Sequence, residues 1–91
     1  MARLFKTSGE VTDVIPGNGD RFTLNELKRI VGGGIEVIHL DFGDLMVINS
    51  DGDKPGRRQL NPAATYIYSK GTGCNDLIHG DALICEKGEV E

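Results

Sequence analysis

The sequence predicts a single small α+β domain with the element order ββαββαβ. One segment carries both a helix start and a helix stop, apolar runs of strand length lie on either side of it, and turn-forming residues separate these runs. At 91 residues the chain has the size of one domain. Two short helices are too few for a doubly wound parallel sheet. We therefore expect a small mixed or mainly antiparallel sheet with both helices on one face.

The first two strands are expected at residues 3–7 and 11–15, which are β-prone runs. The short segment between them contains Gly9, a residue typical of hairpin turns, and residues 16–20 hold the proline and glycines that stop the second strand. This part of the chain therefore predicts a β-hairpin.

The first helix has the clearest local signals. Thr23 and Glu26 have the spacing of a capping box, and Phe22 is placed to pack on Leu27 as a hydrophobic staple. Gly32 can supply the left-handed conformation that ends a helix. The residues expected on the buried face are Leu24, Leu27, Ile30 and Val31.

After the three glycines, residues 35–40 and 45–49 are strong strand patterns joined by a short turn, and we expect both strands to be central in the sheet. Asn61 followed by Pro62 is the start signal of a second helix, expected to run from residue 62 to about residue 69.

The last strand is expected at residues 81–86, preceded by a loop that begins at residue 70. Residues 87–91 form an acidic tail that we expect to fray. The whole chain, residues 1–91, is interpreted as one domain.

Charge and composition exclude some classes of function. Fourteen acidic and ten basic side chains give a net charge of −4, which disfavours general DNA binding because that affinity depends on Lys and Arg. The sequence has no secretory signal and no apolar stretch of membrane-span length, so we expect a cytoplasmic protein. Cys74 and Cys85 are expected to be reduced, with one of them buried.

Four short pieces occur in an order that resembles a known family. They are IVGGGIEVI, MVINSDG, LNPAAT and LIHGDALI, and together they span nearly the whole chain. The family is a domain of unknown function in small proteins encoded mainly by phages, plasmids and other mobile elements. The resemblance implies an accessory protein of a mobile element in the cytoplasm of a bacterial host, and it implies no catalytic residues.

Several motifs are weak candidates for chemistry. The glycines at 32–34 follow a helix, whereas phosphate loops place them before one, so we interpret them as a helix stop and tight turn, with close approach of Gly34 to a ligand or subunit as the alternative. Asp51 and Asp53 lack the later ligands of a calcium loop. His39, His79, Cys74 and Cys85 lack the paired spacing of zinc ligands.

No catalytic constellation can be assembled from sequence neighbours. No serine lies in a strand-to-helix elbow, and Cys74 has no adjacent activating residue. Asp76 and Asp81 can pair across a turn, but beside Gly80 they are interpreted as turn formers. We therefore expect no catalytic residues, no metal and no cofactor.

A basic cluster is the leading candidate for binding. Lys54, Arg57 and Arg58 precede the cap of the second helix, and arginine can hold a phosphate through two hydrogen bonds. Asn61 marks a helix N-terminus, and Tyr66 or Tyr68 can stack on a base. The predicted ligand-binding residues are Arg57, Arg58, Lys54, Asn61, Tyr66 and Gly34. The alternative is a solvated loop whose arginines pair with nearby acidic residues.

These observations favour a non-enzymatic protein of a phage or mobile element that binds and sequesters a small anionic ligand. A nucleotide signal of host defence is the expected ligand, enclosed between subunits of a homo-oligomer because one small domain has little volume for a pocket. The alternative function is a module that inhibits a host enzyme through its acidic surface or through an unpaired edge strand such as residues 3–7.

Overall fold

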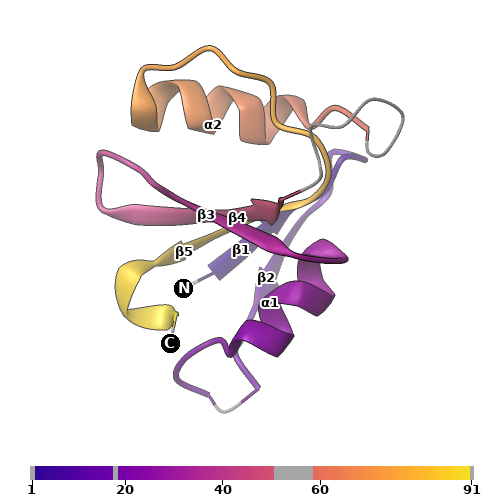
Figure 1. Ribbon diagram of the computed structural model, residues 1–91, viewed down its shortest axis with the longest axis vertical. Coiled ribbons are helices and arrows are strands. Elements are labelled where there is room, and N and C mark those ends of the chain that lie inside the picture. The colour runs from indigo at the N-terminus through magenta and orange to yellow at the C-terminus, as the bar shows by residue number, and fades with distance from the viewer. Residues whose placement is uncertain (1, 18, 51–58, 91) are drawn as a thin grey trace.

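The computed structural model describes residues 2–17, 19–50 and 59–90, and it confirms the predicted α+β fold with the order ββαββαβ (Figure 1). The elements are β1 (Ala2–Phe5), β2 (Val11–Val14), α1 (Leu24–Val31), β3 (Ile35–His39), β4 (Asp44–Asn49), α2 (Pro62–Thr72) and β5 (Ala82–Glu86). In the described residues, no helix has the length and apolar character that crossing a membrane requires.

The five strands form one sheet in the order β2-β1-β5-β4-β3, with antiparallel pairing between all neighbours. The last strand, β5, is therefore the middle strand, and it joins the two hairpins. Two expectations are wrong: β3 is an edge strand and not a central one, and β1 is an inner strand and not an edge. β1 is an inner strand because it pairs with β5, with Leu4 opposite Leu83. These two strands lie near opposite ends of the chain, so no local sequence pattern indicates their pairing.

The two helices lie on opposite faces of the sheet, which corrects the expectation that both cover one face (Figure 1). On β4, Leu45 and Val47 pack in the core on the α1 side, while Met46 and Ile48 pack in the core on the α2 side. Successive residues of a strand point to opposite faces, so an unbroken apolar run such as this one needs cover on both. The sheet is therefore the middle layer of three.

Helix α1 begins as its sequence predicts. The Thr23 hydroxyl accepts a hydrogen bond from the Glu26 amide at 3.2 Å, and the Glu26 carboxylate accepts one from the Thr23 amide at 3.0 Å. Phe22 and Leu27 are buried in the same core cluster, and Gly32 ends the helix with a φ of 82°. Leu24, expected on the buried face, is instead 53% exposed.

Helix α2 is longer than predicted and ends at Thr72, because Gly71 lies inside the helix and not in a loop. Gly71 is buried, and a Cβ atom there would lie 2.7 Å from Cδ2 of Leu40. The missing side chain therefore allows α2 to pack closely against the β3–β4 turn. Gly73, with a φ of 76°, caps the end of the helix.

The C-terminal segment, where we expect fraying, forms the 3₁₀ turn η1 (Lys87–Glu89). The Phe22 amide donates a hydrogen bond to the Glu89 carbonyl at 2.6 Å, and Val90 forms a parallel bridge with Phe22. This contact joins the end of the described chain to the start of α1.

Candidate functional site

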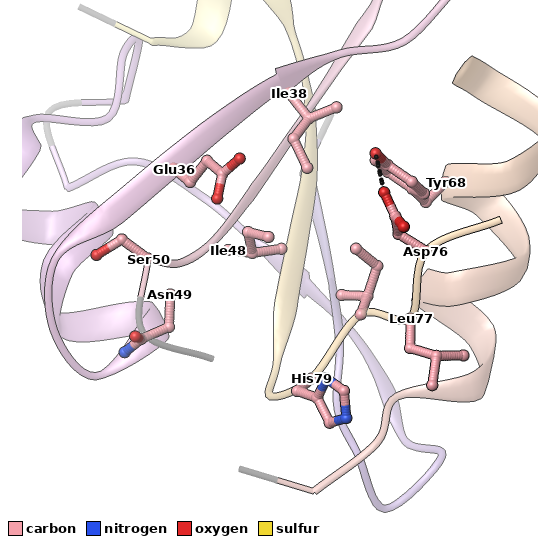
Figure 2. Close-up of a pocket in the computed structure, with 10 residues that line it drawn as sticks. Glu36, Ile38, Ile48, Asn49, Ser50, Tyr68, Asp76, Leu77 and His79 are labelled. Atoms are coloured by element: carbon pink, nitrogen blue, oxygen red, sulfur yellow. Dashed lines mark hydrogen bonds between the residues drawn. The ribbon is translucent and has the colours of Figure 1, made fainter. Parts of the chain in front are cut away.

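A groove of about 470 Å³ lies between the sheet and α2, on the face opposite α1 (Figure 2). This volume is in the range of small-molecule sites, roughly 300–1,000 Å³. Its lining residues come from β3, β4, α2 and the loop that follows α2. They are Glu36, Ile38, Ile48, Asn49, Ser50, Tyr68, Asp76, Leu77, Ile78 and His79.

The edge of the sheet forms one wall of the groove. Glu36 and Ile38 are two residues apart on β3 and therefore share the face toward α2. Glu36 is paired with Ile48 of β4 in the strand register. The Glu36 side chain is exposed and points from the strand into the groove (Figure 2). In the described part of the chain, its carboxylate makes no hydrogen bond or ion pair.

The opposite wall is formed by α2 and the loop after it. The Tyr68 hydroxyl donates a hydrogen bond to Oδ2 of Asp76 at 3.5 Å, the dashed contact in Figure 2. Burial, followed by the neighbouring Cys74 and Asp76, raises the pKa of Tyr68 above its ordinary value of 10.0. Tyr68 therefore keeps its proton at neutral pH and presents a hydrogen-bond donor and an aromatic ring at this wall.

Hydrogen bonds hold the loop against α2. The Ile78 amide donates to Oγ1 of Thr65 at 2.9 Å, and the Asn61 amide donates to the Ile78 carbonyl at 2.8 Å. His79, the next residue, pairs with Leu60 in an isolated bridge. The Nδ1 atom of His79 is buried and has no hydrogen-bond partner within the described structure. The lower end of the groove is thus fixed by backbone contacts.

The groove has a distinct electrostatic character. Its described lining carries the carboxylates of Glu36 and Asp76 and includes no lysine or arginine. Carboxylates accept hydrogen bonds and do not donate them. The two carboxylates favour a ligand with hydrogen-bond donors, and the isoleucines favour a ligand with apolar surface.

The basic cluster predicted to bind the ligand, Lys54, Arg57 and Arg58, lies outside the described residues. Ser50, the described residue immediately before this segment, lines the groove. Gln59, the described residue immediately after it, does not line the groove, and its carbonyl accepts a hydrogen bond at 2.8 Å from the Gly80 amide.

Asn61 has a structural place in the fold. Its side chain is fully buried, and Oδ1 caps α2 by accepting from the Ala64 amide at 3.1 Å. Nδ2 donates to the carbonyls of Phe5 at 2.8 Å and Gly80 at 2.9 Å. All of these partners belong to the protein, so the side chain is engaged by the fold and not presented to a ligand.

The remaining predicted site residues lie outside the groove lining. Tyr66 is 63% exposed on α2, with Nζ of Lys70 at 5.5 Å from the centre of its ring. Tyr68, two positions further along the helix, is the tyrosine that lines the groove. Gly34 contacts the groove indirectly, since its carbonyl accepts from the Ser50 amide at 2.9 Å and a Cβ would lie 2.8 Å from Oγ of Ser50.

Of the residues that line the groove, the sequence indicated Tyr68 for stacking but did not indicate Glu36. Glu36 is the one charged residue in the apolar strand β3 apart from its terminal histidine, and that interruption was the available signal. Asp76 and His79 were considered only as a turn former and a zinc ligand, because their position opposite β3 depends on the tertiary fold. Within the described residues, no group of three His, Cys, Asp or Glu side chains is arranged to hold a metal ion.

A second hollow of about 370 Å³ lies at the end of α1 and is lined by Thr7, Arg29, Ile30, Val31, Gly32, Gln59 and Asp81. It offers Arg29 as a cation, but Oδ1 of Asp81 accepts from the Thr7 amide at 3.0 Å and adds a negative charge. Among the described residues that line it, there is no aromatic ring. The groove beside α2 is therefore the stronger candidate for a ligand with a ring system.

Comparison with known proteins identifies a family without assigning an activity. A family model described as Domain of unknown function (DUF3846) matches residues 4–91. Searches of curated proteins and of solved structures return no match.

Proposed function

The chain belongs to the family described as Domain of unknown function (DUF3846), and we propose that it is a non-enzymatic protein that binds a small nucleotide in the groove between α2 and the sheet. The observation that carries this proposal is the groove itself. It combines a suitable volume, apolar isoleucines, an aromatic ring and converging polar groups on two facing walls.

A nucleotide fits better than a simple anion. The carboxylates of Glu36 and Asp76 repel an isolated phosphate but can accept hydrogen bonds from a base. In the sequence, Lys54, Arg57 and Arg58 follow Ser50, which lines the groove, and arginine can hold a phosphate through two hydrogen bonds. The base is proposed to occupy the groove, and Lys54, Arg57 and Arg58 are proposed to supply the positive charge for the phosphate.

We propose that the groove binds its ligand without catalysing a reaction. In the described part of the chain, no carboxylate or histidine is hydrogen-bonded to the Ser50 hydroxyl, so this hydroxyl has no partner to activate it as a nucleophile. We propose that the protein sequesters its ligand. The resemblance to proteins of phages and mobile elements suggests a nucleotide signal of host defence as that ligand.

The test begins with protein purified from its expression host. The protein is denatured by heat, and released small molecules are identified by mass spectrometry. Nucleotides are then titrated into the ligand-free protein by calorimetry. Recovery of an intact nucleotide and micromolar or tighter binding support sequestration, whereas a chemically altered nucleotide indicates an enzyme. If no nucleotide binds at micromolar concentration, the proposed function is wrong.

The proposed phosphate contacts are tested by the double substitution Arg57→Ala with Arg58→Ala. We expect it to weaken nucleotide binding at least about tenfold, since hydrogen bonds to charged groups are strong. Lys87→Ala is the matched control, because Lys87 lies in η1 and does not line the groove. If the double variant binds the nucleotide as tightly as wild type does, Arg57 and Arg58 do not contact the phosphate.

A protein-interaction module is the second candidate, favoured by the open edge of β3. This strand pairs with β4 on one side and has no strand on its other side in the described sheet. Val37 at its centre is 37% exposed. An added strand can come from a host protein or from a second copy in a homo-oligomer. We expect Val37→Lys to lower the mass measured by light scattering if copies pair through β3.

A further inference from the structure

We propose that the groove selects a guanine base, with the Glu36 carboxylate accepting two hydrogen bonds from its N1–H and 2-amino groups. This inference rests on the proposed function and specifies the ligand class for the same site. It is carried by the position of an unpartnered carboxylate on one wall of the groove.

The Glu36 carboxylate can recognise the edge of a base that presents two adjacent hydrogen-bond donors. A carboxylate presents two acceptor oxygens side by side and no donor. Within the described structure no cation or hydrogen-bond donor occupies these oxygens, and the side chain points into the groove (Figure 2). Guanine presents two parallel N–H donors on one edge, so both oxygens can be satisfied at once.

The other bases match this carboxylate less well. Adenine presents one donor beside an acceptor on each edge, and its ring nitrogen would face a carboxylate oxygen. Hypoxanthine keeps the N1–H of guanine but lacks the 2-amino group. We therefore expect the order of affinity to be guanine, then hypoxanthine, then adenine.

The rest of the lining suits a planar ring. Ile38 and Ile48 provide apolar contact on the sheet side, and Tyr68 provides an aromatic ring on the facing wall. The second carboxylate, Asp76, already accepts a hydrogen bond from the Tyr68 hydroxyl. Glu36 is the groove carboxylate of which both oxygens are without a partner among the described residues.

The test compares three monophosphates that differ only in the base. GMP, IMP and AMP are titrated by calorimetry into wild-type protein and into Glu36→Gln. We expect wild-type protein to bind GMP about tenfold or more tightly than IMP or AMP. Glutamine keeps the shape of the side chain but offers one donor and one acceptor, the pattern complementary to adenine. Glu36→Gln should therefore lose the preference for GMP and gain affinity for AMP.

Glu10→Gln provides the control, because Glu10 lies in the β1–β2 turn, where it pairs with Lys6 at 3.5 Å and does not line the groove. This variant should bind all three nucleotides as wild type does. Far-ultraviolet circular dichroism of Glu36→Gln verifies that the variant is folded.

The outcomes separate the inference from the proposed function. Binding of all three nucleotides without preference, or a preference for GMP that survives in Glu36→Gln, overturns the guanine assignment and leaves the nucleotide groove standing. Absence of binding by every nucleotide overturns both. N-acetyl-arginine amide, whose guanidinium also has paired donors, is titrated as a further probe. If it binds and GMP does not, the groove holds a basic peptide, and the guanine assignment is wrong.

Discussion

Replacement of Asn61 by alanine tests whether this residue serves the fold or a ligand. Its side chain joins three parts of the protein: it caps α2 at Ala64, and it donates to carbonyls at Phe5 and Gly80. The residue is completely buried. Alanine removes all three hydrogen bonds and leaves the Ala64 amide and the carbonyls of Phe5 and Gly80 without these partners.

The expected cost follows from these contacts. Loss of a helix N-cap costs about 1 kcal/mol. Each buried carbonyl that loses its donor costs about 1 kcal/mol or more. The free energy of unfolding should therefore fall by about 3 kcal/mol, a large part of the ~5–15 kcal/mol typical of a domain. For a domain of this size such a loss lowers the Tm by about 10–25 °C.

Thermal and urea unfolding followed by circular dichroism measure this loss. Asn75→Ala is the matched control, because Asn75 is exposed in the loop after α2 and should change the free energy of unfolding by less than about 0.5 kcal/mol. If Asn61→Ala keeps its stability to within 1 kcal/mol of wild type, by the scale of a single hydrogen bond, the structural role assigned to Asn61 is wrong. If Asn61→Ala loses nucleotide binding while its free energy of unfolding is unchanged, Asn61 belongs to the binding site.

Three further predictions concern pH, thiol reactivity and packing. Backbone hydrogen bonds lower the pKa of Glu26 below 4.5, so its contribution to stability is present above that pH and is lost as pH falls further. Glu26→Gln should flatten the fall in urea midpoint between about pH 5 and pH 3, and an unchanged slope would contradict this. Burial raises the pKa of Cys85 to about 11, so iodoacetamide at neutral pH should label exposed Cys74 in the folded protein and both thiols in urea. Mass spectrometry that finds Cys85 labelled first would refute the burial argument. Gly71→Ala should destabilise the protein by about 1–3 kcal/mol because its Cβ would meet a leucine methyl at 2.7 Å, whereas Gly88→Ala meets no atom within 4 Å and should be tolerated. Equal urea midpoints for the two variants would count against the close packing.

Local signals in the sequence located the elements well. Thr23 and Glu26 start α1, Gly32 ends it, and Asn61 starts α2, because each acts through hydrogen bonds or dihedral angles a few residues away. The predicted end of α2, at about residue 69, is wrong because local signals do not include contacts with distant residues. Gly71 has the local character of a loop residue, and its place inside the helix depends on Leu40, which is distant in sequence.

The arrangement of elements could not be predicted from local patterns. The central position of β5 depends on its pairing with both β1 and β4. The helices were expected on one face, although the unbroken apolar run in β4 is typical of a strand covered on both sides. This run is the local signal that both faces of the sheet are covered.

The groove could be predicted only in part. Tyr68 was considered as a stacking residue beside Tyr66, and the phase of α2 relative to the sheet decides between them. Glu36 lines the groove because β3 lies at the edge of the sheet and opposite α2, and this position depends on the tertiary fold. A site built from separate elements depends on long-range packing, which no single segment encodes.

The most direct test of the nucleotide groove is a ¹⁵N-edited NMR titration of the protein with GMP. We expect the largest shift changes at the backbone amides of Glu36, Ser50, Asp76 and His79, which line the groove from both walls. Changes confined to the hollow around Arg29, or no change at millimolar GMP, would contradict the assignment of the groove as the nucleotide site.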